Sequence, residues 1–263
     1  MIFIFTNLFS LGCSKKIEIL TLATTTSVEN SGLLDVLLPP FEKENKTKIK
    51  VIAVGSGAAI RLAKEGNADI ILVHDPDAEE KFITEGYGTK RYEIMYNDFV
   101  LVGPKNDPAK IKGEKDVTIA FKKIASARAT FISRGDDSGT HKREKKLWEL
   151  ARIEPAGRWF FVSGSGMEET LRITNEKRAY TLTDQGTYLA IKKDLDLTVL
   201  SEGDSRLFNP YAIIPVSPKK YPWLKYKLAT KLVKYVLGEK GQEIIRTYGR
   251  EKFGSPLFYP VKK

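Results

Sequence analysis

The chain has 263 residues, of which 42% are hydrophobic, so it is long enough for one large or two moderate domains with ordinary globular cores. This composition excludes an intrinsically disordered chain. Lys and Arg number 43 against 33 Asp and Glu, a net charge of +10, but the charge is spread along the sequence. A solvated, lysine-rich surface therefore explains it better than a nucleic-acid-binding module, which would rest on net charge alone.

The first 12 residues are almost wholly apolar and end directly before Cys13, the only cysteine. They are too short to span a bilayer as a mature helix and suit the apolar region of an export signal. Leu11, Gly12 and Cys13 resemble the lipobox of bacterial lipoproteins, although Ser10 stands where Leu is usual. We expect residues 1–13 to be a leader cleaved before Cys13, with lipid attached there and the protein outside the cytoplasm. The alternative is a buried N-terminal strand.

Hydrophobic periodicity predicts alternating strands and helices in the first part of the chain. Residues 16–26 are typical of a strand and residues 30–45 of an amphipathic helix. A second strand at 49–57 ends in a glycine-rich turn, a short helix follows at 58–67, and residues 68–74 form a nearly all-apolar third strand. This order predicts a parallel α/β sheet with right-handed crossovers.

A second α/β series follows a strong strand that stops at Gly103 and Pro104. Its expected helices and strands occupy residues 116–134, 142–153, 159–166, 167–177, 179–184, 197–204 and 211–218, followed by two helices in 221–249 separated near Gly238. Trp148, Trp159 and Trp223 have the spacing of core residues, which does not favour a surface for stacking nucleic-acid bases.

Polar clusters rich in hydroxyls and glycines follow several of these strands. They are ATTTS at 23–27, VGSG at 54–57, SRGDDSGT at 133–140, GSG at 164–166 and TLTD at 181–184. Ligands of α/β sheets bind outside the carboxyl ends of strands, where turns into helices present free N–H groups. A helix N-cap at Thr26 or Ser27 would explain one hydroxyl of the first cluster, but not all four.

Donors of this kind suit an oxyanion, because an anion accepts hydrogen bonds and needs no acceptor from the protein. Backbone amides at helix N-termini add a favourable partial positive charge. Gly55 and Gly57 allow the backbone to approach closely, and Ser56 between them can donate its hydroxyl. Arg134 can add a bidentate, charge-assisted contact. The sequence therefore predicts a small anion as the ligand.

An enzyme alternative would be a hydrolase that uses Ser138, His141 and Asp136. A nucleophile and a base three residues apart on one helix rarely align, and the chain has no GxSxG elbow. Asp136 or Asp137 is expected instead to hold Arg134 or to cap the following helix.

The chain has no phosphate-loop motif, no GxGxxG after a strand and no zinc-type Cys or His cluster. Its only histidines are His74 and His141. We expect His74 to be a partly exposed residue at a strand end, although it could line a cleft. The sequence therefore predicts no cofactor and no bound metal cation.

The blocks LATTTSVENSGLL, VGSGAAIRLAKEGNADIILVH, NDFVLVGP, FISRGDDSGTHKREKKLW and YTLTDQGTYLA together resemble the tungstate-binding proteins of bacterial and archaeal ABC transporters. The resemblance implies the type II periplasmic binding protein fold, an α/β fold of two Rossmann-like lobes joined by two crossover strands. It implies one lobe from residues 14–103 plus 208–263 and the other from 104–207, with the ligand enclosed between them.

The resemblance also implies the ligand-binding residues. They are Thr25, Thr26, Ser27 and Ser56 from one lobe and Arg134, Ser138, Gly139 and Thr140 from the other, with Ser165, Gly166, Met167 and Thr181 as further candidates. The implied function is capture, without catalysis or a cofactor, of a tetrahedral oxyanion. Tungstate is the first expectation, and a molybdate or phosphate receptor is the nearest alternative. A monomeric receptor of this kind would deliver its ligand to a membrane permease driven by an ATPase.

Overall fold

A computed structural model describes residues 17–254 and 256–261, so the predicted leader and Cys13 lie outside the described residues. In the first half of the chain the elements are β1 (Glu18–Thr25), α1 (Thr26–Asn30), α2 (Leu33–Asn45), β2 (Thr47–Val54), α3 (Ser56–Lys64), β3 (Ile70–Val73), α4 (Pro76–Thr84), β4 (Tyr92–Pro104), α5 (Val117–Ser126) and β5 (Phe131–Ser133). The second half contains α6 (Gly139–Leu150), β6 (Phe160–Val162), α7 (Met167–Glu176), β7 (Thr181–Asp184), α8 (Gln185–Ile191), the 3-10 helix η1 (Lys192–Asp194), β8 (Leu197–Ser201), the 3-10 helix η2 (Ser205–Leu207), β9 (Phe208–Pro215), α9 (Tyr226–Leu237), α10 (Glu239–Thr247), α11 (Arg250–Phe253) and β10 (Tyr259–Pro260).

The first sheet has β1 between β2 and β3 and parallel to both, which confirms the predicted β-α-β-α-β order. Successive β1 side chains point to opposite faces, so Leu22 packs under α2, α9 and α10, whereas Ala23 packs under α3 and α4. Both faces of the sheet are therefore covered by helices. In this register Thr25 of β1 lies opposite Val54 of β2, so the two polar turns that follow these strands lie side by side.

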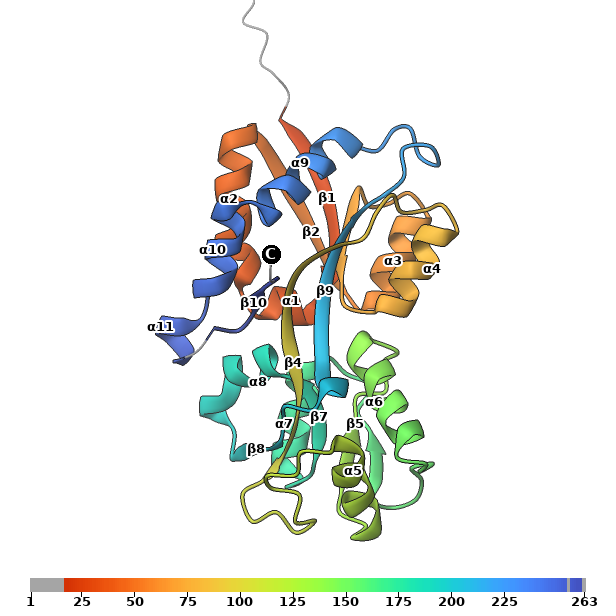
Figure 1. The fold of residues 1–263 in the computed structure, drawn as a ribbon, viewed down its shortest axis with the longest axis vertical. Helices are drawn as coiled ribbons and strands as arrows, with labels where there is room; N and C mark the ends of the chain where they lie inside the picture. Colours follow the sequence, from red (N-terminus) through yellow and green to blue (C-terminus); the bar gives the residue numbers. More distant parts are fainter. Residues whose placement is uncertain (1–16, 255, 262–263) are drawn as a thin grey trace, which may run out of the picture.

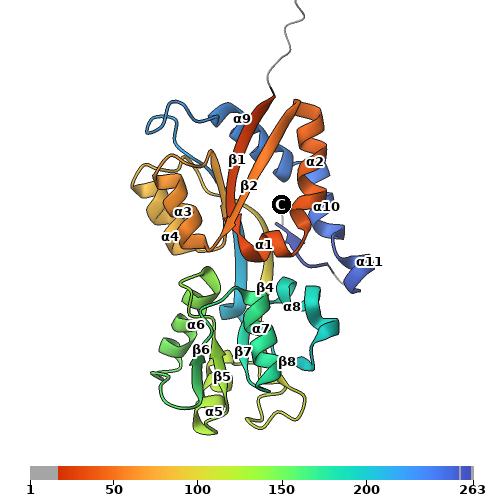
Figure 2. The same ribbon diagram turned by 180° about the vertical axis from the view of Figure 1, so that it is seen from behind.

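Two long strands pass from one half of the molecule to the other. Residues 92–98 of β4 pair with β9 in the first sheet, whereas residues 99–104 pair with β7 and β8 in the second half. Figures 1 and 2 show β4 and β9 running between an upper and a lower body. The fold is therefore the predicted one, with two α/β lobes joined by two crossover strands. Lobe I contains α1–α4 and α9–α11, and lobe II contains α5–α8.

Lobe II is built on the distal end of β4 and on a short parallel pair formed by β5 and β6. The rings of Phe121, Phe131 and Trp148 pack between this pair and helices α5 and α6. Tyr188 anchors the smaller cluster under α7 and α8. This packing fixes the position of the loop between β5 and α6, which carries the SRGDDSGT cluster.

Several local expectations need correction. Trp223 is 68% exposed and is not part of a core, because its ring lies on the outside against Tyr221. Helices α4 and α8 are additions that the periodicity did not indicate, since both are short and begin at a capping aspartate, Asp75 and Asp184 respectively. The predicted break near Gly238 is confirmed, because α9 ends at Leu237. Within the described ranges, none of the helices combines the length and the apolar character needed to cross a membrane.

Candidate functional site

The hydroxyl cluster after β1 forms the first turn of α1. Thr25 is the N-cap, since its Oγ1 accepts from the backbone N–H of Val28 at 3.4 Å. The expected cap at Thr26 or Ser27 is therefore wrong by one or two residues. The Thr25 and Ser27 hydroxyls lie 3.1 Å apart, and both residues are buried. Thr26 points instead toward lobe II and meets Arg134 there.

The second turn, after β2, brings a buried hydroxyl to the same edge of the sheet. Gly55 is the N-cap of α3, and Ser56 is the first helical residue. Ser56 is fully buried, and its Oγ has no hydrogen-bond partner within residues 17–254 and 256–261. A Cβ atom placed on Gly55 would lie 3.8 Å from Ser138 of lobe II, so the lobes touch at this point. A buried hydroxyl of this kind can donate its hydrogen bond to a ligand in the cleft.

Arg134 lies in the cleft with only 3% of its surface exposed. Its Nε donates to Asp136 Oδ2 at 2.8 Å, which confirms that an aspartate of the same loop holds the guanidinium. Its Nη2 donates to Thr26 Oγ1 at 3.3 Å, across the cleft, and its Nη1 to Thr140 Oγ1 at 3.5 Å. The guanidinium therefore joins hydroxyls from both lobes. Its charge is partly balanced by one carboxylate of its own loop.

The loop before α6 is organised by the same aspartate. The second oxygen of Asp136 accepts from the N–H of Ser138 at 3.1 Å. The Ser138 hydroxyl in turn caps α6 by accepting from the N–H of His141 at 3.3 Å. The amino-terminal end of α6, with its partial positive charge, therefore lies beside the guanidinium of Arg134.

Three hydroxyls around Arg134 share one property: each accepts a hydrogen bond from a protein N–H group and donates to no other described residue. They are Thr26, Ser138 and Thr140. Thr25 also accepts from an N–H group, but it shares a further hydrogen bond with Ser27 in which either hydroxyl can be the donor. A group that can donate and has already accepted is best completed by a further acceptor. Because Ser56 is unpaired as well, the cleft presents an excess of hydrogen-bond donors.

Four further residues from the sequence prediction lie outside this arrangement. The hydroxyls of Thr181 and Ser165 donate to the carbonyls of Ile132 and Ser163 at 2.7 and 3.3 Å, so their hydrogens are already used. Met167 packs in the core under α7, and Gly166 is exposed at the start of that helix. Among the described residues, no hydrogen bond joins any of these four residues to Arg134 or Thr26.

His74 differs from the expected partly exposed residue, because only 5% of it is exposed. Its Nδ1 lies 2.9 Å from Asn209 Oδ1, and its ring stacks on Tyr211 with centroids 4.8 Å apart. Burial lowers the pKa of His74. A Cβ placed on Gly139 of lobe II would lie 2.9 Å from this ring, so lobe II rests directly on it. The sequence around His74 could not predict its burial, because Gly139, the residue that covers it, lies 65 residues away.

Polar residues on the crossover strands were missed by the sequence analysis. Asn209 of β9 donates from Nδ2 to Asn97 Oδ1 of β4 at 2.7 Å and to Tyr211 Oη at 3.1 Å. Asn97, Asn209 and Tyr211 are all at least 99% buried. The available signal was an asparagine within each of two strongly apolar strands. These residues tie the two crossover strands together between the lobes.

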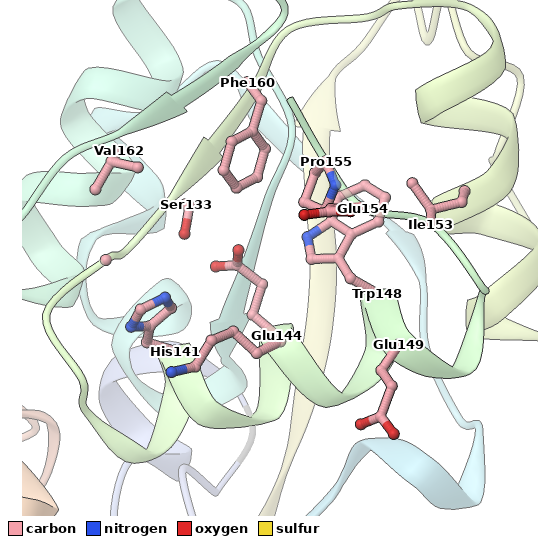
Figure 3. Close-up of a pocket in the computed structure, with 12 residues that line it drawn as sticks. Ser133, His141, Glu144, Trp148, Glu149, Ile153, Glu154, Pro155, Phe160 and Val162 are labelled. Carbon is pink, nitrogen blue, oxygen red and sulfur yellow. The ribbon is translucent and has the colours of Figure 1, made fainter. Parts of the chain in front are cut away.

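A cavity of about 580 Å³ lies on lobe II behind the Arg134 loop (Figure 3). Glu144, 1% exposed, faces into it between Ser133 and His141, and its Oε2 accepts from the backbone N–H of Arg134 at 3.3 Å. Burial raises the pKa of Glu144 to about 7. Glu144 therefore supports the Arg134 loop from the side of this cavity. His141 supports the same loop, because its Nδ1 accepts from the N–H of Asp137 at 3.0 Å.

The hydrolase alternative has no support in this geometry. The Ser138 hydroxyl contacts the backbone of His141, and the imidazole contacts the backbone of Asp137, so the two side chains do not form a nucleophile and base pair. Within the described ranges, His, Cys, Asp and Glu side chains form no group of three or more that could hold a metal ion.

The two-lobed fold with a donor-lined cleft is that of a solute-binding protein, and a family model supports this class. The model, described as a PBP superfamily domain, matches residues 15–240, so the chain belongs to the PBP superfamily.

Closer relatives give the particular family. The tungstate-binding protein TupA of Peptoclostridium acidaminophilum is 49% identical over 241 residues, covering 91% of this chain and 84% of the relative. The crystal structure of the tungstate ABC transporter from Geobacter sulfurreducens has 52% identity and a TM-score of 0.81, covering 88% of this chain and 99% of the other. The tungstate-binding protein TupA of Desulfovibrio alaskensis G20 has 42% identity and a TM-score of 0.81, covering 94% and 100%. The chain is a member of this family of binding proteins, which is not a family of enzymes.

Proposed function

We propose that the protein captures a tetrahedral oxyanion, tungstate in the first place, between its two lobes and delivers it to an ABC permease driven by an ATPase. The observation that carries this proposal is the set of three hydroxyls around Arg134, those of Thr26, Ser138 and Thr140, that accept from protein N–H groups and donate to no other described residue. A dianion supplies the acceptors that these groups lack and offsets the charge of the guanidinium. The names of the relatives agree with such a ligand.

The proposed ligand shell contains eight residues from the two sides of the cleft. They are Thr25, Thr26, Ser27 and Ser56 of lobe I and Arg134, Ser138, Gly139 and Thr140 of lobe II. Lobe closure would surround the anion and exchange its hydration for fixed hydrogen bonds. The predicted division into residues 14–103 plus 208–263 and residues 104–207 would shift within β4, because residues 99–104 pair with β7 and β8 and would move with lobe II, whereas residues 92–98 pair with β9.

Tungstate and molybdate have almost the same size and charge, so the fit of the cavity and the number of donors must separate them. Phosphate and sulfate have shorter bonds to oxygen, and a cavity shaped for the larger anion would hold them less well. Molybdate and phosphate are the competing ligands that the titration below distinguishes.

Calorimetric titration tests the proposal directly. The purified protein is titrated with tungstate, molybdate, sulfate and phosphate, and we expect one anion per chain with tungstate strongest. Arg134→Ala should weaken binding by at least about 100-fold, because it removes charge-assisted hydrogen bonds of about 1.5–3 kcal/mol each. Arg172→Ala is the matched control, since Arg172 is an exposed residue of lobe II that pairs with Glu168. If none of the four anions produces heat or a thermal shift, the proposal is wrong.

We further propose that residues 1–12 are removed during export by cleavage before Cys13, and that Cys13 anchors the monomeric protein by lipid on the outer side of the membrane. The apolar leader that ends at Cys13 supports this location. In cells, Cys13→Ser should move the protein from the membrane fraction to the soluble fraction, and mass spectrometry should show the loss of lipid. A Cys13→Ser protein that remains in the membrane fraction would exclude the anchor.

A further inference from the structure

Two helices from opposite lobes meet beside the proposed anion site and carry opposite charges. In lobe I, α4 begins after the N-cap Asp75 and carries Asp77 in its first turn. In lobe II, α6 carries Lys142, Arg143 and Lys146 on the facing side. These acidic and basic residues line a groove of about 330 Å³ between the lobes. The two surfaces are therefore complementary in charge where they approach.

One ion pair crosses this boundary. Lys142 Nζ lies 2.7 Å from Asp75 Oδ2, and the side chains are 34% and 9% exposed. The other Asp75 oxygen accepts from the N–H of Ala78 at 3.2 Å, which holds the carboxylate in place on its own helix. Among the ion pairs of the described ranges, this is the one that joins lobe I to lobe II. A pair shielded from water on its acidic side contributes more than an exposed surface pair.

The position of the pair connects it to the closed cleft. Gly139, three residues before Lys142, rests against the ring of His74. His74 in turn directly precedes Asp75 in the sequence. A Cβ placed on Gly57, in the second binding turn, would lie 3.9 Å from Lys142 Nζ. The ion pair therefore forms only when the first turn of α6 has reached lobe I.

We propose that Lys142 and Asp75 are positioning residues that determine how long the anion is retained. This inference rests on the proposed function, since it requires the lobes to open and close around a ligand. When the lobes close, the ion pair forms and holds the amino-terminal turn of α6 against lobe I. When they open, both charges return to water. The pair therefore slows reopening and with it the escape of the anion.

A direct role for Lys142 as a second cation on the ligand makes the opposite prediction for one variant. Asp75→Asn keeps the helix cap, because Asn is as good an N-cap as Asp. If the pair holds the cleft closed, removing the carboxylate charge speeds release of the anion. If Asp75 instead draws Lys142 away from the ligand, the same substitution strengthens binding.

The decisive measurement is the dissociation rate of tungstate by stopped-flow displacement. Asp75→Asn and Lys142→Met should each raise this rate about three- to tenfold, whereas the association rate changes less than about twofold. The double variant should dissociate no faster than either single variant, because both remove the same interaction. Lys146→Met is the matched control, since Lys146 lines the same groove but pairs with Glu149 of its own helix at 3.0 Å. Unchanged rates, additive rates, or tighter binding by Asp75→Asn would each overturn the inference.

A second measurement does not depend on the ligand. Spin labels at Glu80→Cys on α4 and Lys122→Cys on α5, in a chain that also carries Cys13→Ser, report the separation of the lobes by pulsed electron paramagnetic resonance. In ligand-free protein, Lys142→Met should shift the distances toward the open form. Identical distributions with and without Lys142→Met would overturn the role of the pair. If tungstate fails to bind, the proposed function fails while this comparison still decides on the pair.

Discussion

The two walls of the cleft differ in the kind of donor that they supply. Lobe I contributes neutral hydroxyls at the ends of two parallel strands, with Ser56 left unpaired. Lobe II contributes the guanidinium of Arg134, held by Asp136, and the amino-terminal end of α6. Lobe II therefore supplies the positive charge that attracts the ligand, and lobe I supplies neutral hydrogen-bond donors in fixed positions. Closure is what combines them, through the contact between Arg134 and Thr26.

The largest effect on affinity is expected from a substitution in lobe II that keeps the positive charge of residue 134 but changes the shape of its side chain. Arg134→Lys retains the positive charge but loses the planar fork that reaches Asp136, Thr26 and Thr140 together. We expect tungstate affinity to fall about 30- to 100-fold, corresponding to the loss of roughly one charge-assisted hydrogen bond. Isothermal titration calorimetry measures this fall. Affinity equal to that of the parent would show that charge alone is sufficient.

The second test prevents the two walls from meeting. Gly139→Ala places a Cβ 2.9 Å from the His74 ring, which Asn209 and Tyr211 hold in position. We expect tungstate affinity to fall about tenfold or more, because an overpacked contact costs about 1–3 kcal/mol. Gly166→Ala is the control, since a Cβ there meets no atom within 4 Å. If both alanine variants bind equally well, the Gly139 contact does not limit closure.

The third test concerns the neutral wall. Ser56→Ala removes a hydroxyl that has no partner among the residues that the structure describes, so we expect affinity for tungstate to fall roughly tenfold while the free energy of unfolding stays constant or rises. Thr181→Val should do the reverse, because the Thr181 hydroxyl donates to Ile132. Its loss should lower the free energy of unfolding by about 1 kcal/mol and leave affinity unchanged. Calorimetry and urea denaturation together check both; a Ser56→Ala protein with full affinity contradicts the expected role.

The smallest effect on binding is expected behind the charged wall, at Glu144. Its pKa is raised to about 7 by burial, so the folded protein holds a proton there that the unfolded chain releases near its ordinary value of 4.5. The resulting stability is complete below about pH 4.5 and is lost as the pH rises through 7. Glu144→Gln should remove up to about 3 kcal/mol of the difference in unfolding free energy between pH 5 and pH 8. Urea denaturation at both pH values measures it, and an equally steep loss in Glu144→Gln would contradict this origin.

The sequence was informative where the signal is local. The parallel strands, the break at Gly238 and the polar turns after β1 and β2 follow from periodicity and turn chemistry. The role of Asp136 beside Arg134 also follows, because both residues belong to one loop. Family resemblance supplied what local patterns do not contain, namely that the two distant clusters face each other across a cleft.

Contacts between the lobes were beyond the reach of local patterns. His74 is buried by Gly139, and Lys142 finds Asp75, only because β4 and β9 bring the lobes together. The prediction that Trp223 lies in the core was wrong for a related reason. Spacing along the chain does not tell whether a given face of an element is covered by another element. The hydrogen-bond direction of each hydroxyl, which separates Thr26 from Thr181, also requires the folded structure.

The sheet of lobe I also governs the order in which the chain completes its fold. Its strands β9 and β10 come from the last quarter of the sequence, and β10 pairs Tyr259 with Tyr96 of β4. A nascent chain therefore lacks the edge strand of its own first lobe until β10 has been made. Because contacts so distant in sequence form late and slowly, a newly synthesised chain stays incompletely folded for longer. For the export proposed above, that delay would leave time for the unfolded polypeptide to pass through a translocation channel.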